Sequence, residues 1–280
     1  MALGLSTAFT TLFDAEVKQA YQAMSVLRGT TRMRVGVEGN TVKFPKIGKG
    51  VATQRIPQAD VTPLGIGYSQ VSMNMVDYNA AEYSDIFHQQ KVNFQERSEL
   101  VQVVSNAIGR RLDQLILDAI NASSTSLTVA NSIGGSNTNI NVAKLRRVKK
   151  LMDTNNVPPD GRFMCIHAAG LEGLLGETQA TSVDYNSVRA LVSGEVNSFL
   201  GMTFIVLGDR SEGGLAVDGS LDRTCFAWHK DAVGYGEGIG MRSEITYIAE
   251  KTSWLVNALF SANAVAIDDE GIVKITARES

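Results

Sequence analysis

Apolar residues recur every three or four positions, with one turn skipped, in an uninterrupted stretch from Asn93 to Asn121. They are Phe94, Val101, Val104, Ile108, Leu112, Leu115 and Ala119. This spacing predicts one amphipathic helix, with Asn93 as its N-cap. At 1.5 Å per residue such a helix is about 43 Å long, whereas a compact chain of this size has a radius of gyration of about 19 Å. We therefore expect the helix to cross the whole molecule as a spine.

The opposite side of the predicted spine helix is mostly polar. Its residues are Glu96, Glu99, Gln102, Asn106, Arg110, Asp113 and Gln114. Val103 and Leu117 are apolar exceptions on this side, which indicates that they meet a second packing partner. Gly109 lowers the helix propensity by about 1 kcal/mol relative to alanine, but no proline interrupts the run.

A second amphipathic helix is predicted from Ser6 to Leu27, before the body of the chain. One face of it carries Phe9, Phe13, Val17, Ala20, Met24 and Leu27, and Gly29 follows as a stop signal. This helix has no obvious partner nearby in the sequence. It is either an ordinary docked terminal helix or an arm that packs on a neighbouring subunit.

The region from Arg32 to Asp77 has a different character, because glycine and proline separate short strand-like pieces. These pieces are Thr41–Phe44, Ala52–Ile56 and Gly67–Met75. Large apolar residues are sparse between Gly48 and Gly65, which favours a protruding β-hairpin. A lone hairpin is only marginally stable in water, so we expect it to lie on another chain. Its basic residues would suit an acidic patch on that partner, although a solvated loop is the alternative; they are Lys43, Lys46, Lys49 and Arg55.

The middle of the chain alternates between predicted strands and helices. A polar loop or weak hairpin spans Asn121–Asn141. The predicted helices are Val142–Asp153, Leu171–Leu175 and Ser187–Val192, and the predicted strands are Arg162–His167, Met202–Leu207 and Cys225–Trp228. This alternation is typical of an α/β layer.

The end of the chain is predicted to be β. The apolar residues Ile239, Met241, Ile245 and Tyr247 alternate with polar ones, which indicates a strand with one wet face. Trp254–Val265 is apolar on both sides and should be a central strand. Asp268–Gly271 makes a turn, and Ile272–Thr276 pairs back. We expect these strands to pack beside the spine helix.

Composition adds limits to this picture. The chain has 280 residues, 44% of them hydrophobic, and a net charge of −3, which excludes a strongly basic protein that neutralises nucleic acid over its whole surface. The two cysteines, Cys165 and Cys225, lie in apolar runs and are predicted to be buried, inert thiols. No apolar run approaches the length of a membrane span, and the N-terminus does not resemble a signal peptide.

Candidate chemistry is sparse. None of the nucleotide-binding, nucleophile-elbow or zinc-protease motifs occurs, and the glycines at 234, 236, 238 and 240 predict a flexible turn instead of a dinucleotide site. His88, His167 and His229 are widely spread and are interpreted as structural. The three carboxylates Asp268, Asp269 and Glu270 are interpreted as solvated. A basic cluster on the outer face of helix 142–153 comprises Lys144, Arg146, Arg147, Lys149 and Lys150. We expect no catalytic residue, cofactor or metal.

The order of these elements resembles the major capsid proteins of tailed bacteriophages, with the Hong Kong 97 type of fold. Particular stretches also look like that family: Tyr83–Ile86, Ile108–Ile120 with Asp113 inside it, Ser198–Gly201, Ala227–Ala232 and Ile267–Val273. The resemblance implies an α+β fold. Residues 1–35 would be an N-terminal arm, 36–79 an extended loop, 80–122 and 237–280 a peripheral domain, and 123–236 an axial domain.

The resemblance also implies a function. Such proteins assemble as hexamers and pentamers into an icosahedral shell around packaged double-stranded DNA. The implied partners are copies of the chain itself, a separate scaffolding protein and a portal, with weak non-specific DNA contact. The virion is the implied location, after synthesis in the host cytoplasm. Covalent cross-linking through a loop lysine is not carried over, because no acceptor is identifiable.

Two alternatives remain at this level. A bacterial nanocompartment of the encapsulin type shares the fold, and an enzyme with an α/β domain would need a convergent polar cluster. For the capsid interpretation, the candidate contacts between subunits are Phe9, Phe13, Val17, Lys43, Lys46, Lys49, Arg55, Glu96, Glu99 and Arg110.

Overall fold

The computed structural model describes residues 22, 24–58, 60–61, 63–89, 96–177 and 198–279. Several predictions lie outside this part: most of the first helix with Phe9, Phe13 and Val17, the N-cap Asn93, and the helix at 187–192. None of the described helices is long and apolar enough to span a membrane.

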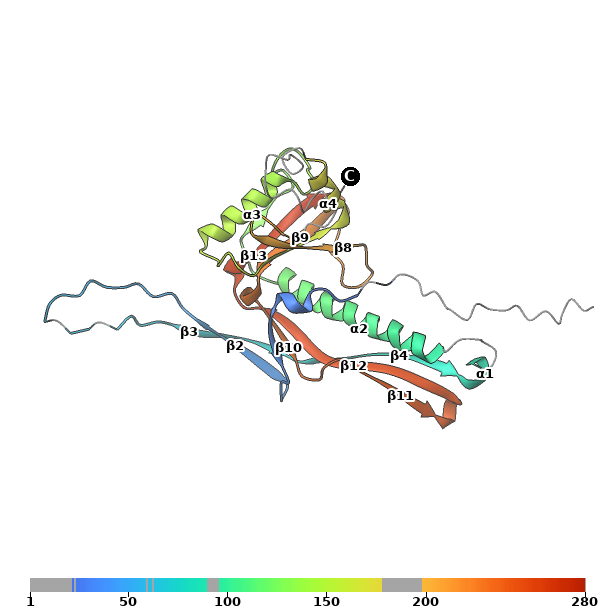
Figure 1. Ribbon diagram of the computed structural model, residues 1–280. Coiled ribbons are helices and arrows are strands. Elements are labelled where there is room, and N and C mark those ends of the chain that lie inside the picture. The colour runs from blue at the N-terminus through green and yellow to red at the C-terminus, as the bar shows by residue number, and fades with distance from the viewer. Residues whose placement is uncertain are drawn as a thin grey trace, which may run out of the picture.

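The described residues form two sheets, a separate hairpin and a long helix (Figure 1). The strands are β1 (Arg32–Val35), β2 (Thr41–Ile47), β3 (Tyr68–Asn74), β4 (Val76–Asp85), β5 (Thr128–Val129), β6 (Arg162–His167), β7 (Ser198–Phe199), β8 (Met202–Leu207), β9 (Asp222–His229), β10 (Val233–Glu237), β11 (Arg242–Ile248), β12 (Ser253–Ala266) and β13 (Ile272–Arg278). The helices are α1 (Ile86–Gln89), α2 (Glu96–Asn121), α3 (Val142–Thr154) and α4 (Ala168–Leu175), with 3-10 turns at Arg28–Thr30, Lys230–Ala232, Ala249–Lys251 and Asp269–Gly271.

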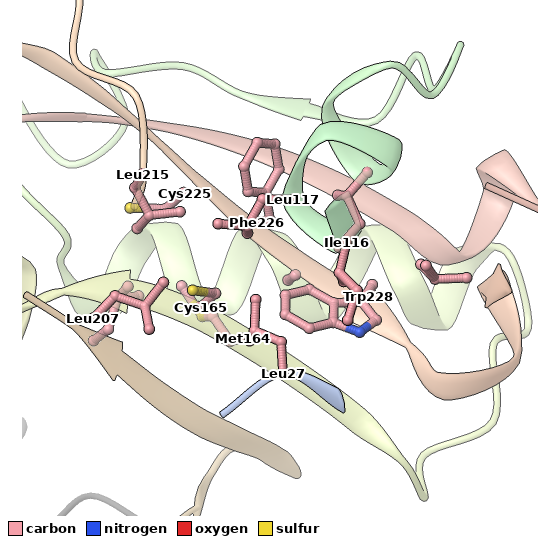
Figure 2. Packing of buried hydrophobic residues seen from close by; sticks show 14 of the residues in the cluster. Leu27, Ile116, Leu117, Met164, Cys165, Leu207, Leu215, Cys225, Phe226 and Trp228 are labelled. Atoms are coloured by element: carbon pink, nitrogen blue, oxygen red, sulfur yellow. The ribbon is translucent and has the colours of Figure 1, made fainter. Parts of the chain in front are cut away.

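The predicted spine helix is confirmed as α2, which has 26 described residues and is about 39 Å long. It lies along the five-stranded sheet, against β12, β4 and β10 (Figure 1). Its last turns enter the core of the second sheet, where Ile116 and Leu117 lie near Trp228 (Figure 2). Leu117 therefore has the second packing partner that its position on the polar side predicted. Asp113, in contrast, was predicted to face outward and is fully buried.

The five-stranded sheet is built around β12, as its apolar sequence predicted. On one side β12 pairs antiparallel with β4 over ten residues, and on the other it pairs with β11 and then β10. β1 adds to the sheet by parallel pairing with β10. Residues 32–35, which follow the N-terminal region, are therefore part of this sheet.

β11 differs from the prediction. Its apolar residues and those just before it were expected to face the core, yet Ile239, Met241, Ile245 and Tyr247 are 42 to 56% exposed. The reason is that β11 is an edge strand and the spine helix lies over its neighbours. An apolar edge of this kind is typical of a surface that another molecule covers.

The six-stranded sheet has the order β5-β13-β9-β6-β8-β7, and α3 and α4 pack on it (Figure 1). Its buried centre includes Met164, Cys165, Phe226 and Trp228 (Figure 2). β13 pairs with β9 and β5 in this sheet, so the expectation that it pairs back beside the spine helix is wrong. Strand partners are set by contacts far apart in the sequence, which a local pattern does not contain.

The glycine run at 234–240 was predicted to be a flexible turn, but its first half is the buried strand β10. The glycines are needed for close approach. A Cβ on Gly234 would lie 2.8 Å from Phe44 Cε2, and one on Gly236 would overlap Met73 Cε. Both contacts come from the hairpin β2–β3, whose base therefore packs directly on this strand.

Two smaller predictions are also wrong. Ala52–Ile56 is not a strand, because nothing among the described residues pairs with it. The first helix does not reach Leu27: residues 24–26 are non-helical, and Gly29 lies inside the 3-10 turn Arg28–Thr30. The backbone N–H groups of Val26 and Leu27 are bonded to the Asp113 carboxylate, so they are not available for an α-helical ladder.

Candidate assembly surfaces

The hairpin β2–β3 projects away from both sheets (Figure 1). Its strands are fully paired from Thr41 opposite Asn74 to Ile47 opposite Tyr68. A small separate core of Val42, Phe44, Met73 and Ile267 fixes its base to the body. The hairpin was predicted from its turn residues and thin apolar content, and this prediction is confirmed.

The far part of the hairpin, between Gly48 and Gly67, forms no strand in its described residues. Four large apolar side chains in it are 51 to 88% exposed: Val51, Ile56, Val61 and Leu64. Arg55 is exposed in the same region. This combination of apolar and basic groups has no internal core to cover it, as expected for a segment that binds another surface.

The hairpin lysines are not all available to a partner. Lys46 Nζ lies 2.9 Å from Asp268 Oδ1, and Lys49 Nζ lies 2.6 Å from Glu270 Oε2. The acidic patch that they were expected to find on another chain is thus present on their own chain, at the turn before β13. The same pairs show that these carboxylates are not simply solvated. Lys43 is exposed and faces neither of them.

Residues 25–27 are bonded to the spine helix through one buried carboxylate. Asp113 accepts hydrogen bonds from Ser25 Oγ, Val26 N and Leu27 N, and Arg210 Nη1 lies 3.1 Å from its Oδ2. Burial raises the pKa of this carboxyl, while the hydrogen bonds and Arg210 oppose the shift. The sequence pattern missed Asp113 as a functional candidate, although a carboxylate placed between Leu112 and Leu115 was a usable signal.

A cavity of about 480 Å³ lies beside residues 24–28. Met24, Leu112, Tyr235 and Phe260 are among the residues that line it. At its rim, Arg28 Nη2 forms an ion pair of 2.7 Å with the buried Glu237 carboxylate. Burial and then the Glu237 charge raise the pKa of Tyr235, so its hydroxyl stays protonated. The cavity is predominantly apolar.

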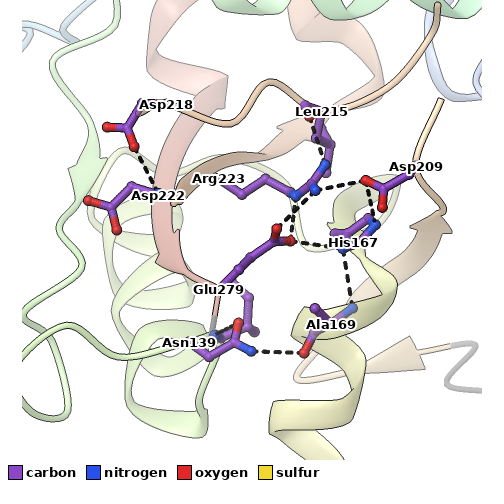
Figure 3. Close-up of polar contacts among 10 residues, drawn as sticks. Asn139, His167, Ala169, Asp209, Leu215, Asp218, Asp222, Arg223 and Glu279 are labelled. Carbon is purple, nitrogen blue, oxygen red and sulfur yellow. Dashed lines mark hydrogen bonds and ion pairs between the residues drawn. The ribbon is translucent and has the colours of Figure 1, made fainter. Parts of the chain in front are cut away.

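A polar cluster at one end of the six-stranded sheet joins segments far apart in sequence (Figure 3). Arg223 Nη2 lies 2.9 Å from both Glu279 Oε2 and Asp209 Oδ1. His167 lies between the same carboxylates, with Nδ1 2.8 Å from Glu279 Oε1 and Nε2 3.3 Å from Asp209 Oδ1. The cluster neutralises a buried guanidinium and fastens the last residues to β9. These contacts agree with the structural interpretation of His167, which stays a prediction.

The other chemical candidates are two histidines and two cysteines. His229 Nε2 lies 2.8 Å from the Asp160 carbonyl oxygen, while the side chain of His88 lies outside the described residues. Cys165 and Cys225 are buried free thiols, and burial raises the pKa of both, to about 12 for Cys225. Within the described part of the chain, no three histidine, cysteine or carboxylate side chains form a group that could hold a metal ion.

The basic face of α3 is smaller than predicted. Arg146, Arg147 and Lys150 are exposed, but Lys144 is fully buried. Its Nζ donates to the carbonyl oxygens of Thr138 and Thr276, at 2.6 and 2.9 Å. Burial lowers its pKa to about 8. We expected Lys144 on the outer face of the helix because lysine is charged. Its position beside Leu145 instead places its side chain against β13.

The remaining predicted contact residues lie on α2. Arg110 is half-buried, and its Nη1 lies 3.4 Å from Gln22 Oε1. Glu99 is half-buried, and the side chain of Glu96 lies outside the described residues. The structure thus pairs Lys46 and Lys49 with carboxylates of their own chain. Among the described residues, it does not bring the candidate contact residues of the hairpin near those of α2.

Known structures share this architecture. The capsid of cyanophage P-SCSP1u matches with a TM-score of 0.76 and 15% identity, covering 100% of this chain and 96% of that chain. The capsid of Helicobacter pylori bacteriophage KHP30 matches with a TM-score of 0.75 and 8% identity, covering 96% and 95%. The capsid of Ralstonia phage GP4 gives 0.72 and 8%, covering 96% and 94%. At such low identities these matches show a shared fold.

Sequence comparison gives the family. No curated protein matches the chain. The model of a family described as phage capsid protein matches residues 5–279, which is nearly the whole length. This match agrees with the fold that the chain shares with solved phage capsids. The chain belongs to the phage capsid protein family.

Proposed function

We propose that copies of this major capsid protein assemble as hexamers and pentamers into an icosahedral phage head that encloses double-stranded DNA. One observation carries this proposal: the hairpin β2–β3 has a firmly packed base and an exposed apolar far part. The exposed residues are Val51, Ile56, Val61 and Leu64. Covering them with a neighbouring subunit removes apolar surface from water, which favours association.

Other contacts between subunits follow from the same proposal. The exposed basic residues Lys43 and Arg55 and the α2 residues Glu96, Glu99 and Arg110 are proposed to contact neighbouring copies. The apolar positions Phe9, Phe13 and Val17 are proposed to do so from the N-terminal arm. Many weak contacts of this kind make a strong shell, because each additional contact within an assembled ring is effectively intramolecular.

The proposal divides the chain in the manner of these shells. Residues 1–35 form the arm and 36–79 the extended loop. The spine helix and the five-stranded sheet form a peripheral domain, drawn mainly from 80–122 and 233–271. The six-stranded sheet forms an axial domain from 123–232, and the pairing of β13 with β9 supports adding residues 272–279 to it.

The partners are proposed from the resemblance to phage capsid proteins and from charge. Copies of the chain are the main partner, with a separate scaffolding protein and a portal during assembly in the host cytoplasm. The net charge of −3 supports only weak, non-specific contact with the packaged DNA, because tight binding requires many uncompensated basic groups. The assembled protein resides in the virion.

The nanocompartment alternative is not favoured, because the matching family is that of phage capsids. The two hypotheses predict different particle contents. A phage head made with its packaging machinery contains DNA, whereas a nanocompartment contains a cargo protein. An enzymatic role is not proposed, because membership of a capsid protein family favours a structural role.

The test is a comparison of two hairpin variants by negative-stain electron microscopy. Replacing Val51, Ile56, Val61 and Leu64 by serine should leave a folded subunit that forms no shells. The control replaces the polar residues Thr53, Gln54 and Gln58 by serine and should assemble normally. Deleting 48–65 should act like the first variant. Normal shells from the apolar-to-serine variant would refute the proposal.

A further inference from the structure

A buried carboxylate lies where three segments of the subunit meet. Asp113 is in the middle of α2 and its side chain is fully buried. Both of its oxygens accept from the segment that leads out to the N-terminal arm: Ser25 Oγ at 2.9 Å, Val26 N at 3.1 Å and Leu27 N at 3.1 Å. These bonds hold three consecutive arm residues against one turn of the spine helix.

The third segment is the loop 208–214, which follows β8 in the six-stranded sheet. From it Arg210 Nη1 reaches Asp113 Oδ2 at 3.1 Å, and its side chain is 9% exposed. The adjacent helix residue Gln114 accepts a hydrogen bond of 2.8 Å from Gly213 N. The loop is therefore fixed to the same turn of α2 as the arm, by two independent contacts.

Both segments approach the helix closely, at glycines. A Cβ on Gly109 would lie 3.3 Å from Ser25 Cβ, and one on Gly213 would lie 2.7 Å from the Arg110 carbonyl oxygen. Gly213 also has a φ of +75°, a backbone conformation that residues with a side chain rarely adopt. Gly109 thus allows the arm segment to pack closely on the helix, and Gly213 allows the loop to pack on it more closely still.

We propose that Asp113 is a positioning residue for shell assembly: it sets the direction in which the N-terminal arm leaves the subunit and couples that direction to the loop 208–214. The clamp rests only on the contacts above, whereas its effect on shells rests on the proposed function. It assigns a role to a residue that the hairpin and charge arguments do not use.

The coupling follows from the cost of an unpaired buried charge. If the loop moves and takes Arg210 away, the Asp113 carboxylate stays buried with only neutral donors from the arm, which is strongly unfavourable. If the arm leaves instead, the ion pair loses the donors that satisfy its remaining lone pairs. Each segment therefore stabilises the position of the other through one side chain.

Hydrogen–deuterium exchange of the full-length, unassembled subunit tests the clamp. Asp113→Asn removes the charge and replaces one of the two accepting oxygens by an NH₂ that faces the Val26 N–H in either orientation, so the amides of Val26 and Leu27 should exchange at least tenfold faster. The matched control is Asp118→Asn, which removes an exposed charge from the same helix and keeps an oxygen that can still accept from Gln114 Nε2. In the control, the two arm amides should exchange as in the wild type.

A second readout separates positioning from general destabilisation. The amides of α2 from Leu115 to Ile120 should keep their wild-type exchange in Asp113→Asn, because their ladder does not depend on the arm. Arg210→Gln leaves the arm bonds intact, yet coupling predicts faster exchange at Val26 and Leu27 in this variant as well. Ser25→Ala, which removes one donor, should give a smaller increase.

Assembly is then examined by electron microscopy. Asp113→Asn should give aberrant or heterogeneous particles, while Asp118→Asn gives normal ones. Unchanged arm exchange in Asp113→Asn, or uniform acceleration throughout α2, would overturn the clamp. Fast arm exchange with normal shells would overturn its role in assembly. If Asp113→Asn does not fold, unchanged arm exchange in Arg210→Gln and Ser25→Ala decides against the proposal. Failure of the wild type to form shells would reject the proposed function alone.

Discussion

Phe44 fills the space that Gly234 leaves open. A Cβ on Gly234 would lie 2.8 Å from Phe44 Cε2 and 2.9 Å from its Cζ. Phe44 belongs to the hairpin strand β2, and Gly234 to the buried strand β10. The missing side chain of one residue thus allows the ring of the other to fix the projecting hairpin to the body.

Gly234→Ala should weaken this attachment. The new methyl group cannot be accommodated unless the buried Phe44 ring moves, and overpacking of this kind costs about 1 to 3 kcal/mol. Urea unfolding of the unassembled subunit measures the effect. The control is Gly67→Ala in the same hairpin, where a Cβ would meet nothing within 4 Å. Equal stabilities of the two variants would show that Phe44 does not rest on Gly234.

The pair Lys46–Asp268 should be measurable without a second subunit. Because both side chains are partly exposed, we expect a coupling energy of only about 0.2 to 1 kcal/mol. A double-mutant cycle with Lys46→Ala and Asp268→Ala, in the unassembled subunit, determines it. The parallel cycle with Lys43→Ala should give no coupling. Coupling in the Lys43 cycle, with none in the Lys46 cycle, would contradict the ion pair between Lys46 and Asp268.

Lys144 should make stability depend on alkaline pH. Burial lowers its folded-state pKa from the ordinary 10.5 to about 8. Between these values the unfolded chain binds a proton that the folded subunit has lost, so the free energy of unfolding should rise with pH. We expect a contribution of about 1 to 3 kcal/mol across this window.

The measurement compares wild type with Lys144→Met in urea at pH 7.5, 9 and 10. The difference between the two proteins isolates this group from other titrations. Lys144→Met should be less stable at pH 7.5, because the carbonyl groups of Thr138 and Thr276 lose a donor. Parallel pH profiles would contradict the assignment of the shift to Lys144.

Glu279→Gln should destabilise the six-stranded sheet. Arg223 is buried, and its guanidinium would lose the negative charge and one of the two accepting oxygens of Glu279, while Asp209 and the Leu215 carbonyl oxygen remain as partners. Removing one charge from such a buried group costs about 1 to 3 kcal/mol. The control Glu244→Gln breaks an exposed pair with Arg242 and should change the midpoint of thermal unfolding very little. A larger effect in the control would contradict the structural role of the cluster.

The elements that the sequence predicts well are those with local periodicity. The helices α2 and α3 and the central strand β12 follow from their apolar patterns, because burial on one face or on both leaves a signature within ten to thirty residues. The hairpin was predicted for the opposite reason: its sequence contains too few apolar residues to build a core.

The predictions that were wrong share one cause, because each depends on contacts between residues that are far apart in the sequence. Asp113 and Lys144 read as outward-facing charges, yet each is buried because its polar partners come from residues far away in the chain, such as Val26 and Thr276. The apolar side of β11 was expected to be core, because an alternating pattern does not show whether the strand lies at the edge of its sheet. The partner of β13 depends on the assembled sheet.

The burial of Cys165 and Cys225 has a practical consequence for studying this protein. The sequence contains two cysteines, both are inaccessible, and the pKa of each is raised by burial. Thiol-directed dyes therefore leave the native subunit unlabelled, because they react with exposed thiolates. A cysteine introduced at Ile56 could carry a fluorophore on the hairpin in an otherwise wild-type background, so that energy transfer between labelled copies follows shell growth in real time.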